Sequence, residues 1–184
     1  MVEIQNFTGK FDHAESFVRA KFDQIDHTGV SVHIKHTRAK GRDLNGYYRF
    51  ADRRIVVSVK KRLRYPRDAA YGVGSTTVKK RGLGGRPYKL VWHEDTFRHA
   101  EDLLVFAAGH EMWHFLCHSG QRRGDFETRA NCNGFYWLSE FKTWDGAGQG
   151  LHPIPTRPPR PGFSPEIEPP DRIGWVQCEL FPDL

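Results

Sequence analysis

The sequence predicts an α+β fold, in which a small domain with a short, mostly antiparallel sheet is followed by a proline-rich extended tail. Three patterns indicate this class: an N-terminal helical repeat of apolar residues, alternating strand-like segments after it, and two longer helical segments before the prolines begin. The 184 residues suffice for one domain with a proper core, and 13% aromatic residues supply bulky material for it. We therefore expect a domain over residues 1–144 and a tail over residues 145–184.

The first half of the domain should contain one helix and several strands. Apolar residues recur at helical spacing over residues 11–27, which predicts an amphipathic helix. Residues 30–34 alternate between valine or isoleucine and polar side chains, which is typical of a half-buried strand. Further strands are expected at residues 47–50 and 55–59, with Asn45-Gly46 as a turn before them.

Glycine and proline mark two other regions. The glycine-rich stretch over residues 72–85 lies between strand-like segments and predicts a hairpin with a mobile tip. Its RGLGGR sequence lacks the Lys-Ser/Thr ending of a P-loop, so no nucleotide site is expected there. All but two of the eleven prolines lie within residues 151–184, a composition that favours an extended tail over regular structure.

Two helices should complete the domain. Asp95 or Thr96 can cap a long helix that runs to about His118. Asp125 can cap a second helix that runs to about Trp144.

Several classes of protein are disfavoured by what the chain lacks. No apolar run approaches the ~20 residues that a membrane span needs, and the N-terminal residues do not resemble a signal peptide. Cys117, Cys132 and Cys178 are odd in number and lack CxxC spacing, so no disulfide framework is expected. We expect a soluble, cytoplasmic protein with no membrane partner.

Basic residues are concentrated in one part of the chain. Residues 31–90 hold 17 Lys/Arg and 3 Asp, a net charge of +14, whereas the remainder holds 11 Lys/Arg and 19 Asp/Glu, a net charge of −8; together these give the overall +6. This segregation indicates a polyanionic partner, most simply DNA, although a solvated basic face explains it equally well. The candidate DNA-contacting residues are Lys60, Lys61, Arg62, Arg64, Lys79, Lys80 and Arg81.

The most informative stretch is GHEMWHFLCH, residues 109–118. His110, Glu111 and His114 form His-Glu-x-x-His; on a helix the two histidines lie ~40° apart around the axis and ~6 Å apart along it, so both can bind one metal ion. Glu111 would lie beside the ion, placed to take a proton from a metal-bound water. The alternative is a pair of buried histidines satisfied by backbone groups. We expect a zinc site.

A zinc site needs a third protein ligand. His118 lies another turn along the same helix, and three consecutive turns spread their donors over ~12 Å, too far for one tetrahedral centre. Glu127, near the start of the next helix, is the best candidate, and Asp125 is the alternative, although its capping role explains it adequately. Cys132 is expected to be a buried small hydrophobic residue rather than a ligand, and so is Cys117.

HEMWHFLCH followed by ETRAN resembles the ImmA/IrrE family of small zinc metallopeptidases, over roughly residues 100–141. The resemblance implies that a Glu-x-x-Ala-Asn helix supplies Glu127 as third ligand and that the substrate is a DNA-binding repressor. The SprT-like peptidases, which act on DNA-associated proteins, are the second resemblance; they usually take a histidine as third ligand, which favours the first family. The long basic insertion over residues 60–95 departs from the compact pattern of that family.

These patterns together predict a zincin-like zinc metalloendopeptidase that cleaves a protein substrate. His110, His114 and Glu127 would hold Zn²⁺, and Glu111 would act as the base. The alternative is a DNA-binding or clamp-associated module with a structural zinc and no peptidase activity. The presence of Glu111, which a structural site does not need, argues against that alternative.

The end of the tail suggests a second partner. Gln177, Leu180 and Phe181 in QCELF have the form Gln-x-x-Leu-Phe, which resembles short peptides that dock on bacterial sliding clamps. A proline-rich tether would present such a motif away from the domain. The alternative is that these apolar side chains fold back onto the domain.

Overall fold

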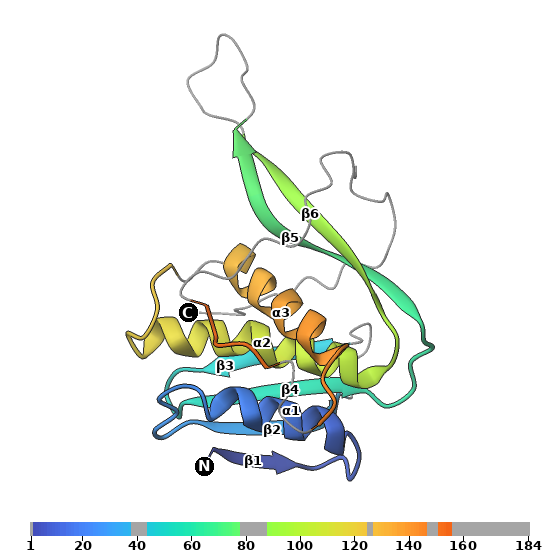
Figure 1. The fold of residues 1–184 in the computed structure, drawn as a ribbon, viewed down its shortest axis with the longest axis vertical. Coiled ribbons are helices and arrows are strands. Elements are labelled where there is room, and N and C mark those ends of the chain that lie inside the picture. Colours follow the sequence, from blue (N-terminus) through green and yellow to red (C-terminus); the bar gives the residue numbers. More distant parts are fainter. Residues whose placement is uncertain (1, 38–43, 78–87, 125–126, 147–150, 156–184) are drawn as a thin grey trace.

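The computed structural model describes residues 2–37, 44–77, 88–124, 127–146 and 151–155 (Figure 1). Its elements in chain order are β1 (Glu3–Asn6), α1 (Asp12–Phe22), β2 (Ser31–Thr37), β3 (Leu44–Arg49), β4 (Arg54–Lys60), β5 (Arg67–Thr77), β6 (Tyr88–Phe97), α2 (Ala100–His118) and α3 (Glu127–Phe141). The expected α+β class is confirmed. None of the helices in these described segments is long and apolar enough to cross a membrane.

The main sheet is mixed, with strand order β1-β2-β4-β3. β1, β2 and β4 are parallel, and β3 is antiparallel to β4 at the edge. The expectation of a mostly antiparallel sheet is therefore wrong for this sheet. The reason lies in two connections: α1 crosses over the sheet between β1 and β2, and β3 turns back into β4, which then lies beside β2.

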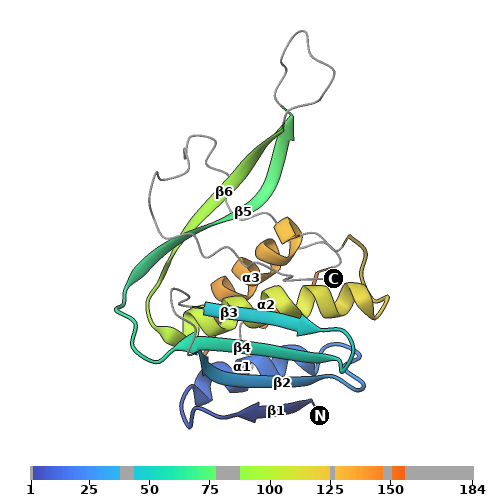
Figure 2. The same ribbon diagram turned by 180° about the vertical axis from the view of Figure 1, so that it is seen from behind.

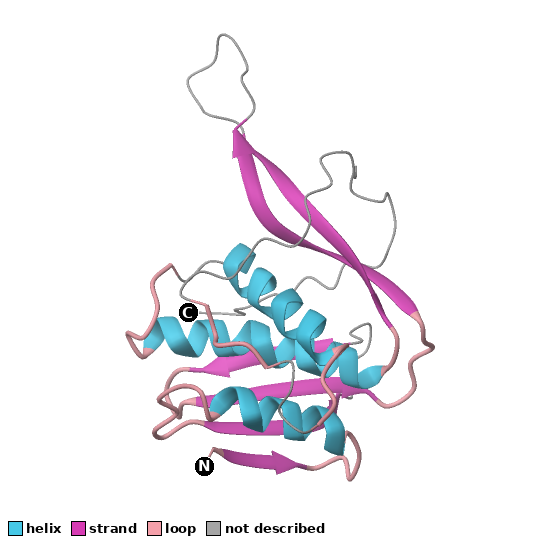
Figure 3. Cartoon of the chain, viewed as in Figure 1, coloured by secondary structure: helices cyan, strands magenta, loops and turns pink. Residues whose placement is uncertain are grey.

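β5 and β6 form a separate antiparallel hairpin, as the glycine-rich stretch predicted. Figure 3 shows this pair as a long ribbon that reaches beyond the helices. The register shifts between Gly72 and Gly74, which marks an irregularity in β5 at the level of α3.

Helices cover one face of the main sheet. α1 and α2 lie in front of the sheet in Figure 1 and behind it in Figure 2. The apolar stripe of α1, including Phe17 and Phe22, is fully buried against the core. α3 packs on α2 at two glycines: a Cβ at Gly134 would lie 2.7 Å from the backbone oxygen of Phe106, and a Cβ at Gly109 would lie 2.8 Å from the ring of Trp137. The two helices therefore approach each other closely at both glycines.

Several element boundaries differ from the sequence expectation. β1 was not expected, and α1 ends at Phe22 instead of residue 27. Asn45-Gly46 lies inside β3, not in a turn. α2 begins at Ala100, because Asp95 and Thr96 belong to β6. The N-cap residue His99 makes no side-chain capping hydrogen bond, and Asp102 in the first turn of α2 accepts a hydrogen bond from the backbone N–H of Arg98 at 2.7 Å.

Part of the segment assigned to the tail lies against the domain. Lys21 Nζ, which is buried, donates hydrogen bonds to Glu140 Oε2 at 2.5 Å and to the backbone oxygen of His152 at 2.9 Å. The backbone N–H of His152 donates to Glu140 Oε1 at 3.2 Å. Arg122 donates to the backbone oxygen of Ile154 at 3.1 Å, and Ile154 itself is buried. Residues 151–155 are thus fixed across α1, α3 and the loop after α2.

Candidate metal centre

α2 places His110, Glu111 and His114 together in the interior. Their exposed fractions are 3%, 1% and 8%. The two Nε2 atoms are 3.2 Å apart, and the ligand atoms of all three residues lie within 4.8 Å of one another. The helical spacing of the motif produces this convergence, and the group could hold a metal ion.

The carboxylate of Glu127, at the start of α3, joins this group. Its Oε2 lies 3.3 Å from His110 Nε2, and its Oε1 lies 3.4 Å from His114 Nε2. Burial alone would raise the pKa of Glu127, but hydrogen bonds and charge from the two histidines in their protonated form outweigh burial and hold its pKa well below the usual range. Its side chain remains 52% exposed. The group therefore opens to solvent on the side of α3.

The other candidate ligands lie elsewhere. His118 packs its ring against Tyr48 and Phe50, with centroid distances of 5.5 and 5.2 Å, one turn beyond the histidine pair. Cys132 is buried and donates from Sγ to the backbone oxygen of Val73 at 3.3 Å. Asp125 lies outside the described residues.

Glu111 is held between α2 and the edge strand β3. The backbone N–H of Tyr48 donates a hydrogen bond to its carboxylate. A Cβ at Gly46 would lie only 2.8 Å from Glu111 Oε1 and 3.3 Å from its Cγ, so a larger residue there would require the buried Glu111 side chain to shift. Gly46 pairs with Val57 of β4, which places Asn45-Gly46 within a strand. Burial raises the pKa of Glu111, and its Oε2 has no hydrogen-bond partner among the described residues.

Asn131 is a site residue that the sequence reasoning did not identify. Its Nδ2 donates to the backbone oxygen of Gly72 in β5 at 2.8 Å, so its Oδ1 must be the atom that accepts from His110 Nδ1 at 2.9 Å. The hydrogen on Nδ1 leaves the lone pair of neutral His110 on Nε2, which faces His114 and Glu127. Asn131 follows Glu127 by four residues, which puts both side chains on one face of a helix. This signal was present in the sequence.

The donor set fits a cation. Without one, the Nε2 lone pair of His110 would face both a carboxylate oxygen and a second imidazole nitrogen at hydrogen-bond distance. The lone pairs of these atoms would repel one another, and a proton or a metal ion between them removes this repulsion. Two imidazole nitrogens and one carboxylate, with one side open, are the ligand set of many catalytic zinc sites.

The predicted partner-binding residues are only partly described. Lys60, Lys61, Arg62 and Arg64 are exposed at the end of β4 and in the loop after it. Lys79, Lys80 and Arg81 lie outside the described residues, and so do Gln177, Leu180 and Phe181 of the tail motif. The clamp-docking interpretation therefore stays a prediction.

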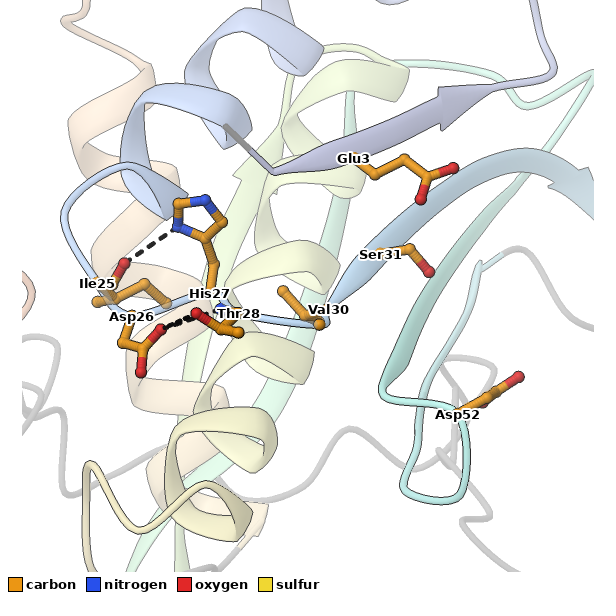
Figure 4. Close-up of a pocket in the computed structure, with 9 residues that line it drawn as sticks. Glu3, Ile25, Asp26, His27, Thr28, Val30, Ser31 and Asp52 are labelled. Carbon is orange, nitrogen blue, oxygen red and sulfur yellow. Dashed lines mark hydrogen bonds between the residues drawn. The ribbon is translucent and has the colours of Figure 1, made fainter.

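A separate pocket of about 560 Å³ lies at the N-terminal ends of β1 and β2 (Figure 4). Glu3, Asp26 and Asp52 are among the residues that line it, and their carboxylates lie apart from one another in Figure 4. Asp26 already accepts hydrogen bonds from the backbone and hydroxyl of Thr28, and Asp52 pairs with arginine side chains. We assign no binding site to this pocket.

No family model, curated protein or solved structure matches this chain. The chemistry of the candidate metal centre is therefore inferred from its own residues.

Proposed function

We propose that the protein is a zinc-dependent metallopeptidase that hydrolyses peptide bonds in a protein substrate. In this proposal His110, His114 and Glu127 bind the metal and Glu111 is the general base. The observation that carries it is the state of Glu111. This carboxylate is buried beside the two histidines, and its Oε2 has no hydrogen-bond partner in the described part of the chain. Leaving such an atom unsatisfied costs about 1–3 kcal/mol, which a purely structural metal site has no reason to bear.

The residues of the centre suit this chemistry. A bound zinc ion would supply a Lewis acid that polarises the scissile carbonyl and makes a water molecule more acidic. Glu111, with its pKa raised by burial, is suited to accept the proton of that water and then to give it to the leaving amine. The backbone N–H of Tyr48 keeps one side of the carboxylate in place. Asn131 fixes the tautomer of His110.

The surroundings favour catalysis over a structural role for the metal. Glu127 is 52% exposed, so a substrate can approach from its side. β3 lies at the edge of the described sheet and passes directly beside Glu111. An extended peptide could pair with that edge and bring its backbone to the metal centre.

Peptidase activity can be tested without knowing the natural substrate. Zinc-loaded protein is incubated with a peptide library prepared from whole-proteome digests, and new termini are identified by mass spectrometry. We expect cleavage that stops on chelation and is absent with Glu111→Gln, although this variant still binds one zinc per chain. Equal cleavage by the wild type and by zinc-bound Glu111→Gln would overturn the proposal.

The same variant serves to identify the substrate class. The resemblance to ImmA/IrrE and SprT-like peptidases suggests a DNA-bound protein such as a repressor. Glu111→Gln should retain such a protein uncut, and the wild type should release it as fragments. Retention by Glu111→Gln of a protein that the wild type leaves intact would count against that protein as substrate.

A further inference from the structure

The helix-free face of the main sheet carries an unusual group of side chains. This face is turned to the viewer in Figure 2, with α1 and α2 behind it. Since Val32 and Ile34 are buried on the helix side, the alternating residues His33 and Lys35 point to the other side. Lys60 shares this face, because it pairs with Thr37 in the register of β2 and β4. Lys60 is the last residue of β4, and the parallel strands β1 and β2 end at the same end of the sheet.

An exposed aromatic ring lies at the same end. Phe7 directly follows β1, its backbone N–H donates to the backbone oxygen of Ile34 at 2.9 Å, and its side chain is 64% exposed. The ring of His33 lies against it with a centroid distance of 5.5 Å. Burial and the nearby Arg54 lower the pKa of His33, which keeps its ring neutral near pH 7. Two uncharged rings are thus presented at a basic edge.

The loop after β4 presents more positive charge. Between Asp52 and Asp68 the chain has seven Lys/Arg and no Asp or Glu. Leu63 and Tyr65 pack against the core, whereas Lys61, Arg62 and Arg64 are exposed. The two anchored apolar residues hold the backbone of the loop, so the cations around them are presented outward.

We propose that this surface binds a single strand of nucleic acid. Phosphates would contact the cations of Lys35, Lys60 and the following loop, and a base would stack on Phe7. An exposed ring beside cations suits a strand whose bases are unpaired better than a duplex, whose bases are already stacked. The carboxylates of the pocket in Figure 4 lie at the opposite end of the strands and would confine the strand to the basic end. The metal centre lies on the helix side, so both can be occupied together.

The charge contribution is tested with two matched double variants of the full-length, zinc-loaded protein. The probe is a fluorescein-labelled oligo(dT) of about 20 nucleotides, followed by anisotropy at about 50 and 200 mM salt. Arg62→Glu/Arg64→Glu should weaken binding at least about tenfold and reduce the salt slope by about 1.4, since each phosphate contact contributes about 0.7. Arg49→Glu/Arg123→Glu removes the same charge at two other exposed positions and should change affinity less than about twofold.

The stacking contribution is tested with the two exposed phenylalanines. Phe7→Ala should weaken oligo(dT) binding at least about fivefold, whereas Phe50→Ala, which removes a side chain 68% exposed at the other end of the sheet, should not. Equal losses in the matched variants would overturn the proposal, as would tighter binding of a duplex of the same length. Displacement of oligo(dT) by polyglutamate at equal charge would overturn it in favour of a general acidic partner. None of these results depends on peptidase activity.

Discussion

Two groups of buried ionisable side chains connect the helices of this protein, and they differ in whether their polar atoms have hydrogen-bond partners. In the first, the ammonium of Lys21 and both carboxylate oxygens of Glu140 have hydrogen-bond partners, including the backbone of His152. In the second, Glu111 is 1% exposed but its Oε2 has no partner among the described residues. The facing nitrogens of His110 and His114 are only 3.2 Å apart.

The difference separates a charge pair that is satisfied within the fold from a carboxylate that we propose to be a general base. A buried ion pair whose charged groups bond to each other and to the backbone is strongly destabilised by loss of one partner. A buried carboxylate with an open lone pair costs folding free energy, and the atom is left available to something that is not part of the chain. Substitutions in the first group should therefore reduce stability, and substitutions in the second should reduce metal binding or activity.

The largest effect is expected at Glu111. Glu111→Gln should reduce peptide cleavage about 10²- to 10⁴-fold, because the proton acceptor is lost. Its thermal midpoint should stay the same or rise, because a neutral amide is easier to bury than an unsatisfied carboxylate. Cleavage assays and thermal melts on the same zinc-loaded samples measure both quantities. A large fall in stability would place Glu111 in the structural group.

Lys21→Met should show the reverse behaviour. It leaves the Glu140 carboxylate buried without its cation, which should cost about 3–5 kcal/mol of unfolding free energy. Zinc stoichiometry in the remaining folded protein should stay at one per chain. The double variant Lys21→Met/Glu140→Leu should recover much of the loss in urea melts. An equal or greater loss in the double variant would show that the two side chains do not stabilise each other.

Glu127 tests which acidic residue completes the metal centre. Glu127→Ala should weaken zinc binding by about 100-fold or more, since removal of a direct ligand should exceed the 10- to 100-fold effect of an outer residue. His118→Ala, one turn beyond the pair, should leave zinc affinity nearly unchanged. Competition with a chromophoric chelator measures both. The opposite ranking would require a different set of ligands.

Asn131 should act on the metal through His110. Asn131→Ala removes the acceptor for His110 Nδ1 and should weaken zinc binding about 10- to 100-fold. Asn131→Asp keeps an acceptor for that hydrogen and should recover part of the affinity. If both variants bind zinc as the wild type does, the hydrogen bond does not orient the imidazole.

The smallest effect concerns Asp102, a buried carboxylate that is fully engaged with Arg98. Burial alone would raise its pKa, but the hydrogen bonds from Arg98 outweigh burial and lower it. A lowered pKa in the folded state gives stability that is present above the unfolded value and is lost as pH falls through the folded one. Wild type should therefore lose more stability than Asp102→Asn between about pH 5 and pH 3, measured by urea melts. If the unfolding free energies of the two proteins fall in parallel with pH, this prediction is wrong.

Local patterns predicted what depends on neighbours in the chain. The helical spacing of the two histidines and Glu111 predicted their convergence, because that geometry is set within two turns of one helix. Strand alternation similarly located β2, and the strand expected at residues 55–59 corresponds to β4. Glu127 was also anticipated, and it lies within 3.4 Å of both histidines, although its role as a ligand stays a prediction.

Features that depend on distant segments were missed. The parallel pairing of β1 with β2 and the ion pair between Lys21 and Glu140 join segments whose contact has no local signature. Gly46 was assigned to a turn because Asn-Gly usually forms one, but it pairs with Val57 of β4 within a strand. Pairing with β4 overrode the local preference of Asn-Gly for a turn.

The close contact of α2 with α3 has a consequence for which substitutions the protein can accept. Any side chain at Gly134 would meet a backbone oxygen, which cannot turn aside, and one at Gly109 would meet an indole ring. Relief would require the helices to separate, which would carry Glu127 away from the histidines. In a saturation mutagenesis screen selected for function, these two glycines should tolerate as little change as the proposed metal ligands, although both lie between the helices.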